Sequence, residues 1–112
     1  MKTIIAGSRT IRNYRLVEDV ILSCPWSIST IISGMARGVD TMAVQFAHEY
    51  NYPLLSMPAD WSQGRGAGYT RNIRMAEQAN GLIAIWDGQS RGTKHMIDIA
   101  RLSGLRIHIV RA

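Results

Sequence analysis

The sequence lacks the features of a membrane protein and of a disulfide-stabilised one. Cys24 is the one cysteine among 112 residues, so no disulfide can form within the chain. No apolar run approaches the roughly 18 residues that cross a bilayer, and residues 3–6 already read as a strand rather than as part of a signal peptide. We therefore expect a cytoplasmic protein with no membrane partner, folded as one domain over residues 1–112.

Lysine is scarce as well, and this scarcity bears on function. Eleven arginines but only two lysines underlie the net charge of +5. Arginine carries a planar fork of donors that matches two oxygens of a phosphate or carboxylate, whereas a protein that only coats nucleic acid can use either basic residue. The composition therefore favours recognition of individual anionic groups. Five arginines lie just beyond predicted strands: Arg9, Arg37, Arg65, Arg71 and Arg91.

Apolar residues alternate between strand-like and helix-like spacing. Short apolar runs predict strands at 3–6, 28–32, 54–57, 82–86 and 105–110. Helical spacing predicts helices at 14–24, 39–50, 72–79 and 91–103, with Asn13 and Ser90 as caps and Gly104 ending the last helix. Alternating strands and helices form right-handed βαβ units. The sequence thus predicts the α/β class: a single Rossmann-like domain with a five-stranded, mainly parallel sheet and helices on both faces.

Four glycine- and arginine-bearing loops, 7–9, 33–40, 58–72 and 87–93, follow these strands. In a parallel sheet they emerge at one edge, where backbone N–H groups, helix N-termini and guanidinium groups together bind anions. None contains a Walker lysine, and the spacing of GRGAG differs from the dinucleotide fingerprint, which argues against an ordinary ATPase or NAD-dependent dehydrogenase. The residues expected to contact the ligand are Gly7, Ser8, Arg9, Ser33, Gly34, Arg37, Asp60, Trp61, Arg71, Asn72, Asp87, Gly88, Ser90, Arg91, Gly92 and Thr93.

The order of these motifs is specific. The succession GSR, SGMARGVD, PADW, GRGAGYTRN, NGLIAIWDG and SRGTKHM covers nearly the whole chain. It resembles the SLOG superfamily and, within it, the small stand-alone group related to YspA and YpsA. The resemblance implies a Rossmann-like domain that recognises nucleotides or nucleotide-derived signals. The chain departs from the usual pattern at Met35, where a second glycine is common and where the larger side chain is expected to narrow the pocket, and at Asn80, where an aspartate is common.

The resemblance also bears on catalysis. In the LOG enzymes, an arginine aligns with Arg71 and a PGGxGTxxE loop aligns with residues 86–96. Glycine and threonine are retained in that loop, but Met96 stands in the place of the glutamate that assists N-glycosidic cleavage. The resemblance therefore implies a binding site without the catalytic group, and we expect negligible release of free base from nucleoside monophosphates. A Met96→Glu change is the corresponding way to introduce weak activity.

Several polar residues have two interpretations. Asp60 and Asp87 either hydrogen-bond ribose or hold Mg²⁺, or they cap turns. Asp40 is expected to contact the backbone of its own loop, Trp61 to stack on a base and Trp86 to lie in the core. The three histidines lack metal-ligand spacing, so neither a metal site nor a resident cofactor is indicated.

Three functions follow from this sequence. The first is a binding module that senses, sequesters or presents a nucleotide. The second is a nucleoside-monophosphate N-glycosidase that uses Asp60 or Asp87, and the third is a single-stranded nucleic-acid binder that uses Trp61, for which we expect weak affinity. We expect Arg71 to grip phosphate as a solvated arginine that contributes little to stability, the alternative being a structural partner of Asp60 or Asp87. The Met-bearing helices also allow a homodimer or higher homo-oligomer.

Overall fold

Strands and helices alternate through the computed structural model, which describes residues 1–112. Five strands and four α-helices form, as the sequence predicted, together with one short 3₁₀ helix, η1. In chain order the elements are β1 (Lys2–Gly7), α1 (Tyr14–Leu22), β2 (Thr30–Ser33), α2 (Val39–Glu49), β3 (Leu54–Ser56), η1 (Trp61–Gln63), α3 (Ala67–Gln78), β4 (Gly81–Trp86), α4 (Arg91–Leu102) and β5 (Arg106–Arg111).

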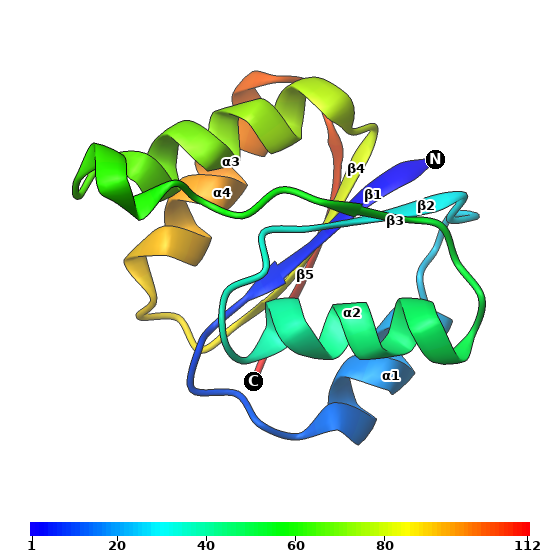
Figure 1. Cartoon of the computed structure of the whole chain (residues 1–112). Helices are drawn as coiled ribbons and strands as arrows, with labels where there is room; N and C mark the ends of the chain where they lie inside the picture. Colours follow the sequence, from blue (N-terminus) through cyan, green and yellow to red (C-terminus); the bar gives the residue numbers. More distant parts are fainter.

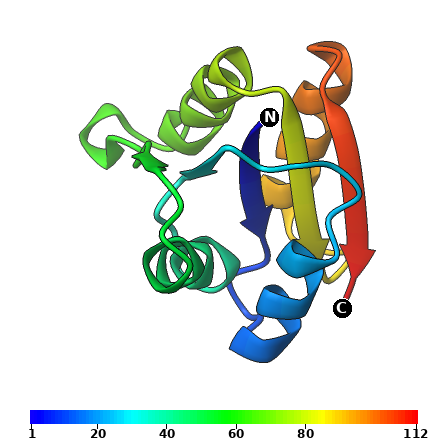
Figure 2. The same ribbon diagram turned by 90° about the vertical axis from the view of Figure 1, so that its right-hand side faces the viewer.

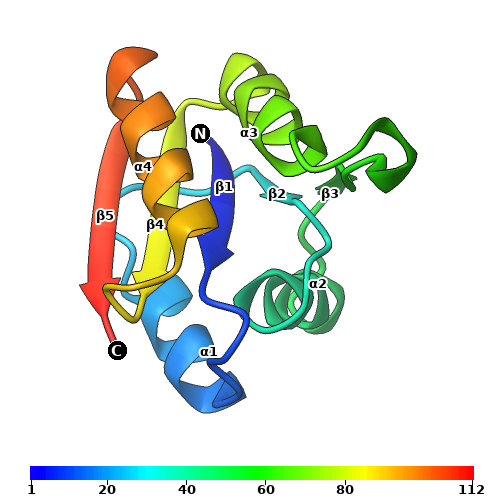
Figure 3. The ribbon, with the colours of Figure 1, turned by 90° about the vertical axis from the view of Figure 1, so that its left-hand side faces the viewer.

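The sheet is parallel throughout, in the order β3-β2-β1-β4-β5. The chain runs outward from β1 to β3 and then returns past β1 to β4 on the other side, as the strand order in Figure 3 shows. The strand order therefore reverses between β1 and β4. In open parallel sheets, ligands bind beyond the carboxyl ends of the strands at this kind of reversal.

Alternating side chains give the sheet two apolar faces. Ile5 and Ile83 pack with α1 and α2 in one buried cluster, whereas Ile4 and Leu82 pack with α3 and α4 in the other. Figure 1 shows α1 and α2 below the sheet and α3 and α4 above it, and Figure 2 shows the two chain ends at opposite ends of the strands. This arrangement confirms the predicted α/β fold with helices on both faces.

Predicted caps begin two of the helices. The side chain of Asn13 accepts a hydrogen bond from the Leu16 amide before α1, and that of Ser90 accepts one from the Thr93 amide before α4. Gly104, at φ +73°, follows the end of α4 in the left-handed conformation that glycine tolerates best.

The start of α3 differs from the prediction. The helix begins at Ala67 rather than at residue 72, and η1, at Trp61–Gln63, was not predicted. Gly66 precedes α3 without a side-chain cap, and Gly68 lies inside its first turn, where a Cβ would stand 3.2 Å from the Trp61 ring. Gly68 thus lets the first turn of α3 pack closely against Trp61, a tertiary contact that apolar periodicity does not record.

Met35 occupies an unusual backbone conformation. Its φ is +63°, in the left-handed region that non-glycine residues rarely adopt. This explains why glycine is common at the position in the pattern that the sequence resembles. The Met35 side chain lines a hollow beside Gly34 and Arg71, so the substitution affects the shape of the carboxyl edge as well as the backbone.

Two further side chains, Cys24 and Trp86, contact the apolar cores. Cys24 is partly buried against the α1–α2 core, and Trp86 is partly buried against the α3–α4 core, as predicted for Trp86. The helices are each too short or too polar to cross a membrane.

Met96 lies in the core rather than at the ligand edge. Its side chain is 1% exposed, on the face of α4 that packs against Ile4 and Ala6 of β1. A glutamate at this position would face the sheet. The gain of activity from Met96→Glu stays a prediction that this burial argues against, because the new carboxylate would lie among apolar side chains.

We predict that Met96→Glu lowers the free energy of unfolding by several kcal/mol, because an unpaired carboxylate in an apolar core is poorly solvated. Met96→Leu, a change of similar volume, is the matched control and should cost less than about 1.5 kcal/mol. Urea denaturation followed by circular dichroism measures both. Equal stability of the two variants would place the Met96 side chain outside the core.

Candidate functional site

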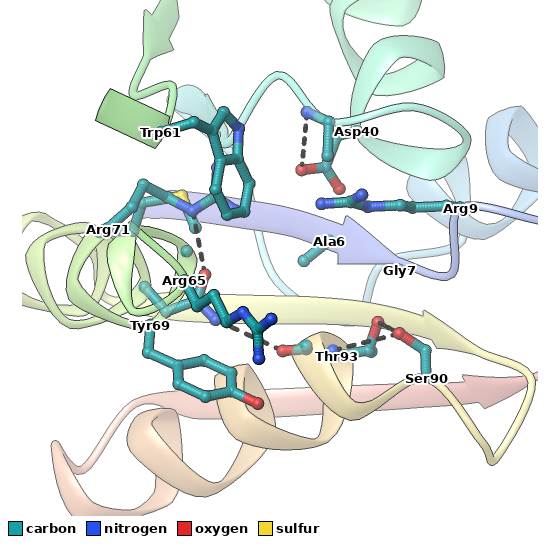
Figure 4. Close-up of a pocket in the computed structure, with 15 residues that line it drawn as sticks. Ala6, Gly7, Arg9, Asp40, Trp61, Arg65, Tyr69, Arg71, Ser90 and Thr93 are labelled. Carbon is teal, nitrogen blue, oxygen red and sulfur yellow. Dashed lines mark hydrogen bonds between the residues drawn. The ribbon is translucent and has the colours of Figure 1, made fainter. Parts of the chain in front are cut away.

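A pocket of about 240 Å³ lies at the carboxyl end of β1, beside the reversal in strand order. Figure 4 shows Arg9 and Asp40 on one side of it and Arg65 and Tyr69 on another, with Trp61 above. The lining residues come from β1, the loop before α2, η1, α3 and the start of α4. They are Ala6, Gly7, Arg9, Ala36, Asp40, Trp61, Arg65, Gly68, Tyr69, Arg71, Asn72, Met75, Ser90, Gly92 and Thr93.

Arg71 ties α3 to the end of β2. Its Nη1 donates to the carbonyl oxygen of Gly34 and, at 3.5 Å, to that of Met57, while Nε donates to Oδ1 of Asn72 at 3.1 Å. A Cβ on Gly34 would collide with this guanidinium group, so a larger residue there would displace Arg71 from its present position. The side chain is half-buried, and burial lowers its pKa. The expectation of a freely solvated Arg71 is therefore wrong, because the side chain spans two backbone segments.

Asp40, rather than Asp60 or Asp87, is the carboxylate that interacts with Arg71. It lies in the first turn of α2, is 5% exposed, and its Oδ2 accepts the Ala36 amide at 3.3 Å. Burial raises the pKa of Asp40 to about 6, although the charges of Arg71 and Arg9 oppose this shift. The predicted contact between Asp40 and its own loop is confirmed, and the structure adds a carboxyl group that gains and loses its proton near neutral pH.

Arg9 and Trp61 form the outer wall of the pocket. The Arg9 guanidinium carbon lies 5.9 Å from the centroid of the Trp61 ring, within the range of a cation–π interaction. Trp61 is 56% exposed and lines the pocket. An indole so placed presents an aromatic face beside a positive charge, which suits a planar, anionic ligand.

The start of α4 forms the opposite wall. The hydroxyl groups of Ser90 and Thr93 form a hydrogen bond of 3.1 Å, and the Trp86 indole donates to the Ser90 carbonyl oxygen at 3.1 Å. A Cβ added to Gly92 would have no atom within 4 Å, so this glycine faces open space. Asn72 donates to the Gly92 carbonyl oxygen at 3.3 Å and thereby links α3 to α4.

Half of the residues expected to contact the ligand line this pocket. They are Gly7, Arg9, Trp61, Arg71, Asn72, Ser90, Gly92 and Thr93. Gly34 and Arg37 line an adjoining hollow that shares Arg9, Trp61 and Arg71, and Asp60 lines another that shares Arg71.

The other expected contacts line none of these hollows. Ser8 is buried, and its hydroxyl accepts the Asp87 amide at 3.0 Å. Ser33 is buried and donates to the Asp40 carbonyl oxygen at 2.9 Å. Asp87 caps the turn before α4 by accepting the Gln89 and Ser90 amides, so its capping interpretation is confirmed. Gly88 lies against the Arg111 side chain, and Arg91 is exposed outside the pocket.

Sequence reasoning missed four of the larger side chains that line the pocket. Asp40 and Arg65 had been noticed but not assigned to the site, while Tyr69 and Met75 had not been singled out. Earlier recognition that α3 begins at Ala67 would have supplied the signal, because Tyr69 and Arg71 then occupy its first two turns. No group of three or more His, Cys, Asp or Glu side chains converges in a metal-binding arrangement.

Comparison with known proteins places the chain in a family. A family model described as "YspA, cpYpsA-related SLOG family" matches residues 1–64, more than half of the chain. The chain belongs to this family. The match covers β1 to η1 and therefore includes Arg9, Gly34, Asp40 and Trp61.

Solved structures add a likeness in fold. DNA processing protein A (DprA) from Streptococcus pneumoniae is similar with a TM-score of 0.82 over 99% of this chain, at 19% sequence identity. The chain spans 50% of the length of that protein. At this identity the likeness concerns the fold alone, and a search of curated proteins found no match.

We predict that Asp40 makes stability fall as the pH rises. Its pKa is raised from 3.8 to about 6 on folding, so its contribution is fully present below the lower value and lost as the pH rises through the higher one. Between about pH 4 and 7, the unfolding free energy of the wild type should fall by about 2 kcal/mol relative to Asp40→Asn.

Denaturant titrations across this pH range measure the difference. Asp60→Asn is the control, because hydrogen bonds from Ser62 lower the pKa of Asp60 and its removal should change the pH dependence in the opposite sense. Parallel curves for wild type and Asp40→Asn would contradict a raised pKa at Asp40.

Proposed function

We propose that the protein binds a nucleotide or a nucleotide-derived signalling molecule at the carboxyl edge of its sheet, as a module that senses, sequesters or presents the ligand. One observation carries this proposal. Three arginines, the start of a twelve-residue helix and an exposed indole line the same pocket, at the reversal of the strand order. These are groups suited to phosphate and to a planar base.

The chemistry of the walls supports one orientation of the ligand. Phosphate oxygens would accept hydrogen bonds at the start of α4, from the backbone N–H groups of the open segment around Gly92 and from the hydroxyl of Thr93. The base would lie against Trp61, whose ring is the largest exposed aromatic surface of the pocket. Arg9, which is exposed and has no carboxylate within 4.0 Å, supplies a charge that a phosphate can approach directly.

A second candidate, an N-glycosidase acting on nucleoside monophosphates, is favoured by Asp40. Asp60 and Asp87 are both hydrogen-bonded as turn caps, and neither lines the pocket. Asp40 does line it, and its pKa of about 6 leaves part of the population able to donate a proton near neutral pH. The glycosidase alternative therefore depends on Asp40 rather than on the two carboxylates that the sequence suggested.

Single-stranded nucleic acid remains the third candidate, and we expect its binding to be weak. The arginines of the edge come from separate loops, and Trp61 and Tyr69 are the only exposed aromatic residues among those lining the pocket. A tight, sequence-tolerant binder needs a continuous basic track with several stacking platforms.

We predict that the correct nucleotide at about 100 times its dissociation constant stabilises the fold by roughly 2.7 kcal/mol. For a domain of this size this corresponds to a rise in melting temperature on the order of 10 °C. Screening ribonucleotides by differential scanning fluorimetry identifies the ligand and measures the rise. The absence of any rise with all ribonucleoside mono- and triphosphates and with the 5′-phosphorylated dinucleotides would contradict nucleotide binding.

Gly92→Ala should weaken ligand binding without lowering the stability of the fold. Its new methyl group meets no protein atom within 4 Å, so the unliganded melting temperature should stay the same or rise slightly, whereas the ligand-induced rise at fixed ligand concentration should shrink. Gly66→Ala is the matched control, because it also adds a methyl group in open space but lies outside the pocket. An unchanged ligand-induced rise in Gly92→Ala would place the phosphate elsewhere.

We predict no release of free base from nucleoside monophosphates above the uncatalysed background. The physical reason is that the carboxylate expected in glycosidases is replaced by Met96, which is buried. Chromatography of reaction mixtures provides the measurement. Release of a base by the wild type that is abolished in Asp40→Asn would replace the binding proposal with the glycosidase one.

A further inference from the structure

A further hollow, of about 290 Å³, shares Arg9 with the pocket. Arg9, Arg12 and Arg37 line it together with Gly38 and Thr41 at the start of α2. Arg9 lines both this hollow and the pocket, so the two spaces share one guanidinium group. We call this further space the arginine hollow.

The arginine hollow carries positive charge that no carboxylate in its own lining compensates. Its lining includes no aspartate or glutamate, and the one ion pair of the molecule, Lys94–Asp98, lies elsewhere on α4. None of the three guanidinium groups makes a hydrogen bond within the protein. Like charges gathered around one hollow repel each other, and a bound anion removes this repulsion while receiving forked hydrogen bonds.

The backbone holds these arginines together. Gly38 has φ +78°, and a Cβ on it would lie 2.5 Å from the Ser8 carbonyl oxygen and 2.7 Å from the Arg9 Cα. Only glycine allows the loop before α2 to lie this close to the loop after β1. That close approach brings Arg37 of one loop beside Arg9 and Arg12 of the other, so the gathering of charge is fixed by the fold.

We propose that the arginine hollow is a second anion subsite, which takes further phosphate groups of the ligand held in the pocket. This inference rests on the proposed nucleotide binding and makes it more specific. The preferred ligand then carries a phosphate chain that extends past Arg9, as in a nucleoside triphosphate or a dinucleotide, rather than the single phosphate of a nucleoside monophosphate. Three guanidinium groups suit such a multiply charged chain better than a lone carboxylate.

Isothermal titration calorimetry at fixed ionic strength tests this subsite. Each of the four ribonucleoside monophosphates is compared with its own triphosphate, with the 5′-phosphorylated dinucleotide of the same base and with an oligonucleotide of ten such units. Inorganic tripolyphosphate serves as a ligand without a base. The test variant is Arg12→Gln with Arg37→Gln, and the matched control is Arg15→Gln with Arg101→Gln, which removes two exposed arginines outside both spaces.

We expect the triphosphate or the dinucleotide to bind the wild type at least tenfold more tightly than the monophosphate. The test variant should lose this advantage while binding the monophosphate within about twofold of the wild type, and the control should match the wild type for every ligand. If the triphosphate binds more tightly, the subsite takes a polyphosphate chain. If the dinucleotide binds more tightly, the subsite takes a phosphodiester. The control should keep the wild-type melting temperature, and the test variant should keep or slightly exceed it, because the four arginines are exposed and lack ion-pair partners and the test variant also removes the repulsion around the hollow.

Any of three results would overturn the subsite. In the first, the wild type binds the monophosphate, the triphosphate and the dinucleotide with equal affinity. In the second, the test variant loses the same factor in affinity for every ligand, and in the third, the affinity of the wild type keeps rising from dinucleotide to decanucleotide. The last result would indicate a continuous nucleic-acid track instead. A different result would contradict nucleotide binding while supporting the anion subsite. In that result no nucleotide binds, tripolyphosphate does bind, and the test variant abolishes the binding of tripolyphosphate.

Discussion

The return of the chain from β3 to β4, past the central β1, is the constraint on which the rest of the structure depends. Because the strand order reverses between β1 and β4, the loops that follow these strands lead to helices on opposite faces of the sheet. The space between them becomes the pocket, and its walls come from segments distant in sequence. Gly7 at the end of β1 marks the centre of this arrangement, since any side chain there would meet β4 and α2.

Charge balance sets what the pocket can accept. Arg71 is held by backbone carbonyl groups and by the nearby carboxyl group of Asp40, so much of its charge is compensated within the protein. Arg9 is exposed and lacks an ion-pair partner, and it faces both the pocket and the arginine hollow. The two arginines therefore have different tasks in this account: Arg71 positions the wall, and Arg9 meets the anion. Protonation of Asp40 at lower pH would make the pocket more positive and favour the anion further.

Much of the fold, but less of the site, could be predicted from the sequence. Buried parallel strands such as β4 are short apolar runs, and the caps Asn13 and Ser90 are local signals, so both were recognisable. The early start of α3 was not, because it depends on packing against Trp61. Ser8 looked like a phosphate ligand, yet its hydroxyl is used within the fold. The raised pKa of Asp40 arises from burial, which a sequence does not display.

Chemical-shift mapping of backbone amides during a nucleotide titration tests the central claim most directly, because it locates the ligand without altering a residue. The account predicts that the largest shifts fall in four separate segments, around Gly7 and Arg9, Gly34 to Arg37, Trp61 to Asn72, and Ser90 to Thr93, which meet only at the carboxyl edge. Shifts that concentrate on α1, on the β5 edge or on the amino ends of the strands, with these four segments unaffected, would contradict it.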